Sequence, residues 1–443
     1  MMNDELLKQI DQAIENSTDA LICDTVKLIR IDSTRTTPAP GAPYGPGVKK
    51  VLDTIMEMGK QEGWHPVDYG MGVCSISVKK GQPDLGIWIH GDVVPVGDGW
   101  IYPPFEGVVH NNCIIGRGAS DNKGQCAAMF NLLKIFKSLG VSLNYNPAIY
   151  VGSNEESGMQ DVIDFMSQCT PPKLSLVPDS SWPVCRGGKG GLTLSFRSKK
   201  PLTGLSVIAG QPASPGRADA ELYGKKFSCE TPPRHGSSPD PNGNMITLMM
   251  NQLLQEEQVA KDDIPVLQFC KDASLDADGK HFGVYVHSDT MVQMTVFART
   301  IDMVDGCLRI GLNFRYPIET TADRIVQQMS QVAEKYGMEL DEIKPGVNPY
   351  LLDPKDPMLL MLRDAANAVI GKDSEPYTMG GGTYAHRLPN AYAFGMSGNR
   401  IPADFPAGHG NVHGKDESVG IENLQRAMKI YARAMLALNE MQW

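Results

Sequence analysis

The chain has 443 residues, more than one hydrophobic core usually spans, so two domains are expected, or three by length alone. A hydrophobic fraction of 42% and a charged fraction of 21% are ordinary for a soluble globular enzyme. The net charge is −10, and neither a basic run nor an apolar run of about 18 residues occurs, so nucleic acid and membrane are excluded as expected partners.

The nine cysteines are scattered singly, and none belongs to a Cys-x-x-Cys pair. Most lie in apolar surroundings, as Cys74, Cys126 and Cys307 do, which favours buried reduced thiols over a disulfide framework. The first residues are acidic and amphipathic, without the basic and apolar regions of a secretion signal. These features predict a cytoplasmic protein.

The first part of the chain alternates between helical and strand patterns. Residues 5–30 carry apolar side chains at helical spacing, which predicts two helices broken near residues 16–18. After a loop rich in Pro and Gly, the expected elements are a helix at 48–63, strands at 74–78 and 85–90, a helix at 125–139, a strand at 148–153, a helix at 161–168 and a strand at 174–178. This alternation predicts an α/β fold with a mixed, mostly parallel sheet sandwiched by helices, whose ligands come from loops beyond the strand ends.

A different pattern begins near residue 188. Alternating apolar residues predict antiparallel strands at 190–196, 293–298 and 308–316, with helices at 245–257 and 320–336. The α/β pattern then resumes with a helix at 357–370, a strand at 391–394 and a terminal helix at 421–441. We therefore expect a catalytic domain in two parts, residues 1–187 and 349–443, interrupted by an α+β domain at 188–348.

Polar residues follow several of the expected strands. His90 and Asp92 stand two residues apart on an extended chain, so their side chains point the same way, and a carboxylate that grips a histidine makes it a better metal donor. Further candidates of the same kinds are Asp121, Glu155, Glu156, Asp179 and, far along the chain, His413. Two histidines with several carboxylates suit a pair of divalent ions, with one carboxylate bridging them.

The adjacent pair Glu155 and Glu156 carries further information. Neighbouring residues cannot both point at one ion from regular structure, so one can bind a metal while the other faces the water that it activates. Motifs for other chemistries do not compete. The glycines at 380–382 lack the Lys-Ser/Thr of a phosphate-binding loop, and no Gly-x-Ser-x-Gly segment occurs.

Four segments, in the same order, resemble the di-zinc metallopeptidase family of aminoacylase-1, carboxypeptidase G, ArgE and DapE. They are residues 90–95 (His-Gly-Asp-Val-Val-Pro), 116–124 (Gly-Arg-Gly-Ala-Ser-Asp-Asn-Lys-Gly), 155–158 (Glu-Glu-Ser-Gly) and Asp179. The resemblance covers nearly the whole chain. Within the family, residues 380–385 and the long insertion look most like PepV-type bacterial dipeptidases.

The resemblance implies two divalent ions per chain, zinc first, with manganese or cobalt as alternatives. It implies one ion on His90 and Asp179, and the other on Glu156 and His413. Asp121 would bridge the two ions. It also implies Glu155 as the general base, Asp92 as the residue that orients His90, and a cis peptide bond between Asp121 and Asn122.

The choice between His409 and His413 rests on local sequence. Four residues apart, they would pair on a helix, but Pro406 and the glycines around them make a helix improbable. The family places its ligand four residues before a glutamate, here Glu417. We therefore expect His413 as the ligand and His409 as a loop histidine.

The insertion resembles a lid. His235 resembles the lid histidine that stabilises the oxyanion of the tetrahedral intermediate in this family. Arg315 resembles the arginine that grips a substrate carboxylate, for which a guanidinium fork is well shaped, and Gly381 is assigned to substrate binding. Two positions depart from the pattern: residues 211–215 offer Gln in place of Asn, and Asn313 stands where Asp is common. The insertion is long enough for His235 to act within its own chain, which predicts a monomer.

The predicted reaction is hydrolysis of the peptide bond in short peptides, above all dipeptides with free termini. Glu155 would take a proton from a water shared by the two ions and return it to the leaving amine. The alternative enzyme is an N-acyl-amino-acid deacylase with the same site. A silent binding module would not need Glu155, and a structural calcium protein would not use two histidines.

Overall fold

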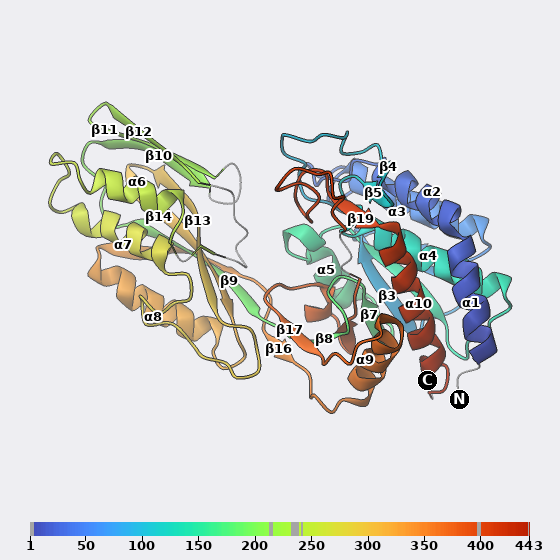
Figure 1. The fold of residues 1–443 in the computed structure, drawn as a ribbon. Helices are drawn as coiled ribbons and strands as arrows, with labels where there is room; N and C mark the ends of the chain where they lie inside the picture. The colour runs from blue at the N-terminus through green and yellow to red at the C-terminus, as the bar shows by residue number, and fades with distance from the viewer. Residues whose placement is uncertain (1–3, 212–215, 232–238, 241, 397–399, 442) are drawn as a thin grey trace. The chain divides into compact units, whose positions relative to one another are not determined.

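The computed structural model describes residues 4–211, 216–231, 239–240, 242–396, 400–441 and 443. The chain divides into two compact units. The first unit comprises Met1–Arg186, Leu352–Tyr377 and Thr383–Trp443, and the second comprises Gly187–Leu351 and Thr378–Gly382. The colours of Figure 1 follow the chain through both units.

A mixed sheet forms the centre of the first unit, and its four central strands are parallel. In spatial order they are β6 (Pro147–Gly152), β3 (Leu85–His90), β7 (Leu174–Val177) and β18 (Ala391–Ala393). On the β6 side, β2 (Cys74–Ser77) and then β1 (His65–Asp68) pair antiparallel. Every residue of β3, β6 and β7 is buried, which explains their continuous apolar sequences. The mostly parallel α/β fold expected from the sequence is confirmed.

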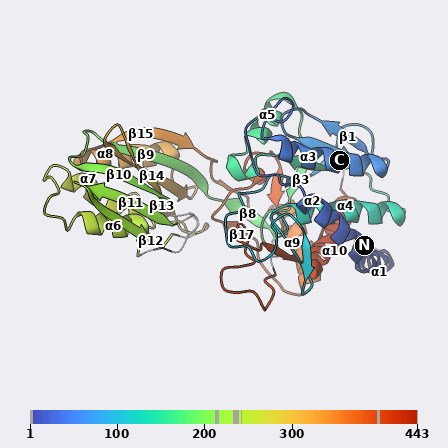
Figure 2. The same cartoon turned by 90° about the horizontal axis from the view of Figure 1, so that it is seen from above.

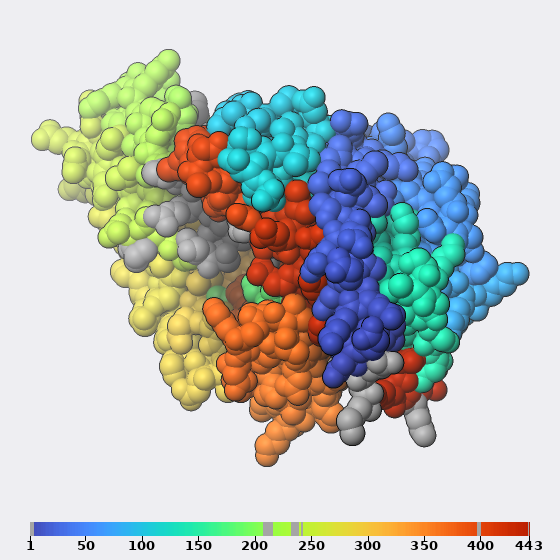
Figure 3. Space-filling view, turned by 45° about the vertical axis from the view of Figure 1, so that its right-hand side comes forward, coloured from blue at the N-terminus to red at the C-terminus, as the bar shows by residue number. Residues whose placement is uncertain are grey.

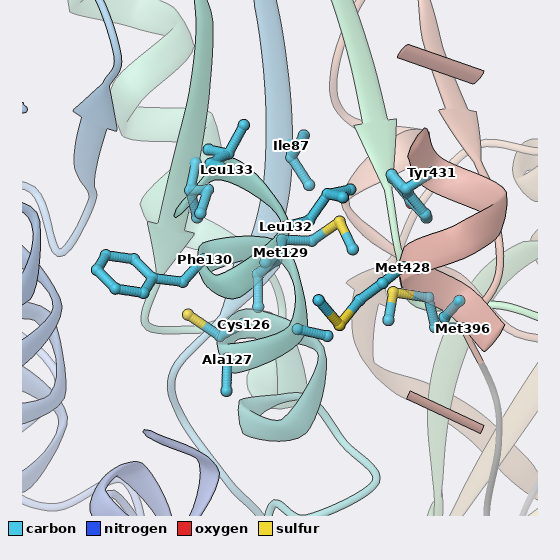
Figure 4. Packing of buried hydrophobic residues seen from close by; sticks show 14 of the residues in the cluster. Ile87, Cys126, Ala127, Met129, Phe130, Leu132, Leu133, Met396, Met428 and Tyr431 are labelled. Carbon is cyan, nitrogen blue, oxygen red and sulfur yellow. The ribbon is translucent and has the colours of Figure 1, made fainter. Parts of the chain in front are cut away.

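Helices cover the sheet on both faces because alternate side chains of its strands point to opposite sides. Trp88 of β3 stacks on Tyr150 of β6 at 4.5 Å and meets Phe165 of α5 (Gln160–Gln168) edge-on. The neighbouring residue Ile87 belongs instead to the core formed with α4 (Lys123–Ser138) and α10 (Ile421–Leu438). Figure 4 shows this core, with Ile87 near Leu132 of α4.

The remaining helices of the first unit close its core. They are α1 (Asp4–Asn16), α2 (Thr18–Ile29), α3 (Pro46–Gln61) and α9 (Pro357–Ile370). The break between α1 and α2 falls at Ser17, as predicted. The first and last helices lie side by side, blue beside red in Figure 3, and Arg433 donates to both oxygens of Asp11 at 2.8 and 2.9 Å. This contact joins the two ends of the chain within one unit.

A small antiparallel sheet brings two distant segments of the first unit together. Its strands are β4 (Val108–His110), β5 (Cys113–Ile115) and β19 (Ser418–Gly420). Ser418 pairs with Ile115, so the residues just before β19 lie next to those just after β5. Both segments carry residues singled out from the sequence.

Within its described residues, the second unit has an antiparallel sheet of seven strands with three helices. In spatial order the strands are β12 (Lys225–Glu230), β11 (Arg217–Leu222), β10 (Leu205–Gln211), β13 (Thr295–Val304), β14 (Cys307–Tyr316), β9 (Gly190–Ser198) and β15 (Met338–Pro345), several of which are labelled in Figure 2. The helices are α6 (Met245–Leu253), α7 (Ile264–Leu275) and α8 (Ala322–Lys335). One core cluster contains residues of the sheet and of all three helices. The antiparallel α+β character expected here is confirmed.

Short strands lie where the chain passes between the units: β8 (Cys185–Gly188), β16 (Tyr350–Leu351) and β17 (Tyr377–Met379). The helix predicted at 245–257 ends at Leu253, and the half-buried Leu254 and the polar residues 255–258 follow it outside the helix. Cys74 and Cys126 are buried as expected, whereas Cys307 is only half-buried. Among the described residues, no helix has the length and apolarity required to cross a bilayer.

Candidate metal centre

His90 ends β3 and is almost wholly buried, with 1% of its surface exposed. Its Nδ1 lies 2.9 Å from the backbone carbonyl of Asp92, and its Nε2 lies 2.8 Å from Oδ1 of Asp121. A hydrogen bond from Nδ1 to a carbonyl fixes the tautomer that leaves Nε2 as a metal donor.

The carboxylate of Asp92 binds other groups than the imidazole of His90. Its Oδ1 lies 3.6 Å from Nδ1 of His90, beyond hydrogen-bond distance. Its two oxygens instead accept the backbone N–H groups of Glu155 and Glu156, each at 3.2 Å. Asp92 therefore orients His90 through its main chain and holds the two glutamates through its side chain.

Asp121 lies between the two histidines expected as ligands. Its Oδ1 faces His90, and its Oδ2 lies 2.9 Å from Nε2 of His413. Burial acts to raise the pKa of Asp121, but the neighbouring His90 and His413 outweigh burial and hold the pKa well below its usual range. The peptide bond to Asn122 is cis, as the resemblance implied.

Glu155 and Glu156 follow β6 in a short turn and take part in different groups. Ligand atoms of His90, Asp121 and Glu156 lie within 4.8 Å of one another, and so do those of His90, Glu155 and Asp179. His413 adds to the first group, since its Nε2 is 3.1 Å from Oε1 of Glu156. The structure thus brings together all six residues that the sequence placed near the ions.

Asp179 follows β7, one strand beyond β3. The side-chain amide of Asn122 donates to Oδ1 of Asp179 at 3.3 Å and to the carbonyl of Pro178 at 3.2 Å. Burial first, and then the charge of Asp121, raise the pKa of Asp179 to about 7. Burial and the charge of Asp179 likewise raise the pKa of Glu155 well above its ordinary value.

The donor set fits divalent cations. Four carboxylates face only two imidazoles, and burial first, then their mutual repulsion, raise the pKa values of Glu155, Glu156 and Asp179. Oε1 of Glu156 is buried and accepts no well-aligned hydrogen bond, although His413 lies near it. Positive ions would relieve the repulsion and use the free lone pairs, and imidazole with carboxylate is the ligand mixture that zinc accepts.

Two supporting residues were not identified as functional from the sequence. Arg117 and Glu417 form a fully buried ion pair, with Nη1 and Oε2 2.7 Å apart. The other oxygen of Glu417 accepts the backbone N–H groups of Ser120 and Asp121 at 2.9 and 3.0 Å, and Nη2 of Arg117 donates to the carbonyl of His413 at 3.2 Å. The pair therefore fixes the backbones of two expected ligands. Arg117 lies in one of the segments that carried the resemblance, and Glu417 is the glutamate by which His413 was chosen as a ligand.

Asp161 and Tyr384 support the turn that bears the glutamates. Oδ2 of Asp161 accepts the backbone N–H groups of Ser153 and Asn154 at 2.6 and 3.0 Å and the hydroxyl of Tyr384 at 2.6 Å. Burial raises the pKa of Asp161 to about 6, although the hydrogen bond from Tyr384 acts to lower it. The conspicuous sequence at 380–385 contains Tyr384, but nothing in it pointed to Asp161.

His409 has a structural environment, as expected of a loop histidine. It is buried, and its Nδ1 bonds the carboxylate of Asp416. Oδ1 of Asp416 also accepts the backbone N–H groups of Ile101 and Tyr102, both at 2.9 Å. The imidazole of His409 thus serves loop packing.

The residues expected to bind substrate belong to the second unit. Arg315 lies on β14, opposite Thr295 of β13 and Gly191 of β9, and Gly381 lies in the segment Thr378–Gly382. Asn313 donates to the hydroxyl of Thr193 at 3.1 Å across the sheet. His235, residues 212–215 and the side chain of Gln211 lie outside the described residues.

Histidine and carboxylate side chains at the carboxyl ends of parallel strands, within an α/β fold, define a metal-dependent hydrolase. The chain belongs to peptidase family M20/M25/M40, whose model matches residues 86–437. Members of this family are metal-dependent peptidases, so the protein is a hydrolytic metallopeptidase.

Individual relatives agree with this assignment. The chain is 28% identical over 460 residues to "Putative dipeptidase YtjP" of Bacillus subtilis, covering 94% of this chain and 97% of that protein. Its fold is similar to that of yeast Dug1p (Saccharomyces cerevisiae), described as a di-peptidase, with a TM-score of 0.67, 15% identity and 99% of both chains covered. Human carnosine dipeptidase 1 has a TM-score of 0.66 at 15% identity, covering 98% of this chain and 99% of that one.

Proposed function

We propose that this protein is a dipeptidase that hydrolyses the peptide bond of dipeptides with free termini, using two divalent ions. His90 and Asp179 would hold one ion, Glu156 and His413 the other, and Asp121 would lie between them. Zinc is the first choice of ion, and manganese and cobalt suit the same ligands. The dipeptidase names of the relatives support the substrate class.

One observation carries the proposal: two glutamates adjacent in sequence belong to different groups of ligand atoms. Both groups include His90, but Glu156 is grouped with Asp121 and approached by His413, whereas Glu155 is grouped with Asp179. Bound divalent ions would supply Lewis acidity, polarising the scissile carbonyl and acidifying a water. In this proposal Glu155 coordinates neither ion, so its carboxylate can accept and return a proton.

Glu155 acts as the general base and then as the general acid. Burial, the largest cause of its raised pKa, favours acceptance of a proton from the attacking water. The same carboxyl returns that proton to the nitrogen of the leaving amine when the peptide bond breaks. Asp92 keeps Glu155 in place by accepting its backbone N–H.

We extend the proposal to the inserted domain, residues 188–348, as a lid over short substrates. Arg315 would bind the substrate carboxylate, with Gly381 beside it, and His235 would stabilise the oxyanion. In this proposal His235 acts within its own chain, and the protein is a monomer.

The test is an amine-release assay with metal-free protein resupplied with Zn²⁺, Mn²⁺ or Co²⁺. The substrates are free dipeptides, tripeptides and N-acetyl amino acids. Turnover restricted to free dipeptides is expected, whereas turnover of acetylated substrates alone would assign a deacylase. Glu155→Gln should lower kcat by at least about 100-fold, as loss of a general base does. Glu257→Gln, at an exposed position of the second unit, is the matched control.

A further inference from the structure

A buried lysine of the second unit has no described role in the proposed reaction. Lys189 lies between β8 and β9, and only 2% of its surface is exposed. Its Nζ donates to the carbonyl of Gln293 at 2.6 Å and to the hydroxyl of Thr295 at 3.3 Å. Over the described part of the chain, no carboxylate forms an ion pair with this ammonium group, so its charge is buried against neutral oxygens.

Arg315 places a second positive charge beside this lysine. On the sheet, Arg315 lies directly opposite Thr295 and Gly191. A Cβ atom added to Gly191 would lie 3.1 Å from Nη1 of Arg315, so the guanidinium lies over this glycine. Directly opposed residues have Cβ atoms roughly 4.5–5.5 Å apart. Thr295 thus lies next to both cations. Its hydroxyl contacts the ammonium of Lys189, and its backbone lies opposite Arg315 on the neighbouring strand.

The glycine segment at 380–382 packs against the same lysine. The backbone N–H of Lys189 donates to the carbonyl of Met379 at 3.2 Å. A Cβ atom added to Gly380 would lie 3.3 Å from Cε and 3.6 Å from Nζ of Lys189. A glycine at this position lets the main chain approach the ammonium closely, so the arrangement joins two cations and a glycine segment in one unit.

A buried ammonium beside a second positive charge, here on the half-buried Arg315, is unfavourable, and a bound anion lowers that cost. Burial first, and then the charge of Arg315, lower the pKa of Lys189 to about 8. A carboxylate bound near both cations would offset their repulsion and accept hydrogen bonds from each. The arrangement therefore favours a small organic anion as ligand.

We propose that Lys189 acts with Arg315 as the second cation of the subsite that binds the C-terminal carboxylate of the substrate. Lys189 thereby selects peptides that end in a free carboxylate over those that end in an amide. The inference rests on the proposed function for the identity of the substrate, but the preference for a carboxylate can be measured by binding alone.

The experiment compares alanyl-alanine with alanyl-alaninamide on the metal-loaded protein. Lys189→Met removes the charge and keeps an apolar stem. It should lower kcat/KM for alanyl-alanine by about 10- to 100-fold and change kcat/KM for the amide by less than about 3-fold. Lys344→Met, on the exposed edge of β15 in the same unit, should change neither. An equal loss for both substrates would assign Lys189 a purely structural role and overturn the proposal.

Calorimetric binding of the same two ligands separates this inference from the proposed function. If the wild-type protein hydrolyses neither compound, tighter binding of alanyl-alanine, lost in Lys189→Met, still supports the carboxylate subsite. Equal affinity of the wild-type protein for both compounds overturns it.

If Lys189→Met does not fold, the pH dependence of the wild-type protein tests the proposal instead. Lys189 loses its charge as the pH rises through about 8 in the free protein. The preference for alanyl-alanine over its amide should therefore decrease between pH 7 and 9.5. The α-amino groups of the two compounds differ in pKa, because one compound ends in a carboxylate and the other in an amide, so each amine is titrated separately and the ratio is corrected for it. A constant ratio contradicts the proposal.

Discussion

Single residues that do not face the metal centre set its geometry. One carboxylate oxygen of Asp161 accepts three hydrogen bonds, two from backbone N–H groups just before Glu155 and one from the hydroxyl of Tyr384. The hydroxyl of Tyr384 is the only side-chain donor among these three. Removal of this hydroxyl should therefore loosen the support of the turn without touching any expected ligand.

Tyr384→Phe should lower kcat about 3- to 10-fold and reduce the free energy of unfolding by about 1–2 kcal/mol, the usual effect of a lost buried hydrogen bond. Steady-state kinetics and urea unfolding measure the two effects. Tyr392→Phe is the matched control, because the hydroxyl of Tyr392 donates to Asp356 at 3.1 Å in the same unit. The control should lose stability and keep its activity. An equal loss of activity in both variants would contradict the argument.

Asp92 acts on both sides of the centre with different groups. Its main-chain carbonyl bonds His90, so a substitution of the side chain leaves that bond in place. Its carboxylate oxygens hold Glu155 and Glu156 by their N–H groups. An asparagine would turn an amide donor toward one of these N–H groups.

Asp92→Asn should therefore lower activity or metal affinity about 10- to 100-fold, as the loss of a group that orients metal ligands does. Metal titration followed by a dipeptide assay measures both quantities. Asp98→Asn, at an exposed position of the same loop, is the control. If the two variants behave alike, the carboxylate of Asp92 has no such role.

At the scale of elements, the pairing of β5 with β19 brings Asp121 and His413 together from segments almost 300 residues apart. The buried pair Arg117 and Glu417 stabilises this junction through backbone groups of both segments. A buried charge that loses its partner is far costlier than an exposed one.

Glu417→Gln should accordingly cost about 3–5 kcal/mol of unfolding free energy and weaken metal binding, because Arg117 would stay charged and buried. Denaturant unfolding and metal titration are the measurements. Glu339→Gln, which removes one partner of the exposed Arg197, should cost far less. Comparable losses in the two variants would show that the buried pair is not an anchor.

The sequence predicted those ligands whose positions follow from strand periodicity. His90 and Asp179 end parallel strands, and residues at such ends meet along one edge of a sheet. The strand and helix patterns were equally clear, because β3, β6 and β7 are continuous apolar runs. The assignment of individual ions to individual residues rested on resemblance and stays a prediction.

The supporting residues could not be predicted from the pattern. Arg117, Asp161 and Glu417 act on backbone N–H and carbonyl groups, which every residue carries and no spacing reveals. Helix ends were also placed imperfectly. Residues 255–258 and 439–440 have the polar composition of a helix surface, so the sequence pattern does not mark Leu253 and Leu438 as the last helical residues.

At the scale of the whole molecule, the two units have separate hydrophobic cores. The first unit contains both ends of the chain, joined by α1 and α10, and all five expected metal ligands together with Glu155. Ligands stabilise only the folded region that binds them. The two units should therefore respond differently to metal.

Differential scanning calorimetry should show two unfolding transitions, of which added zinc raises only one. A ligand at 100 times its dissociation constant adds about 2.7 kcal/mol, which corresponds to roughly 5–10 °C for a unit of this size. Asp179→Asn should reduce that shift, since it removes an expected ligand and one of the four repelling carboxylates. Asn313→Asp in the second unit should leave it unchanged. An equal rise of both transition temperatures would contradict this prediction. It would show that the two cores unfold as one cooperative body, because zinc bound to one unit can stabilise the other only if both unfold together.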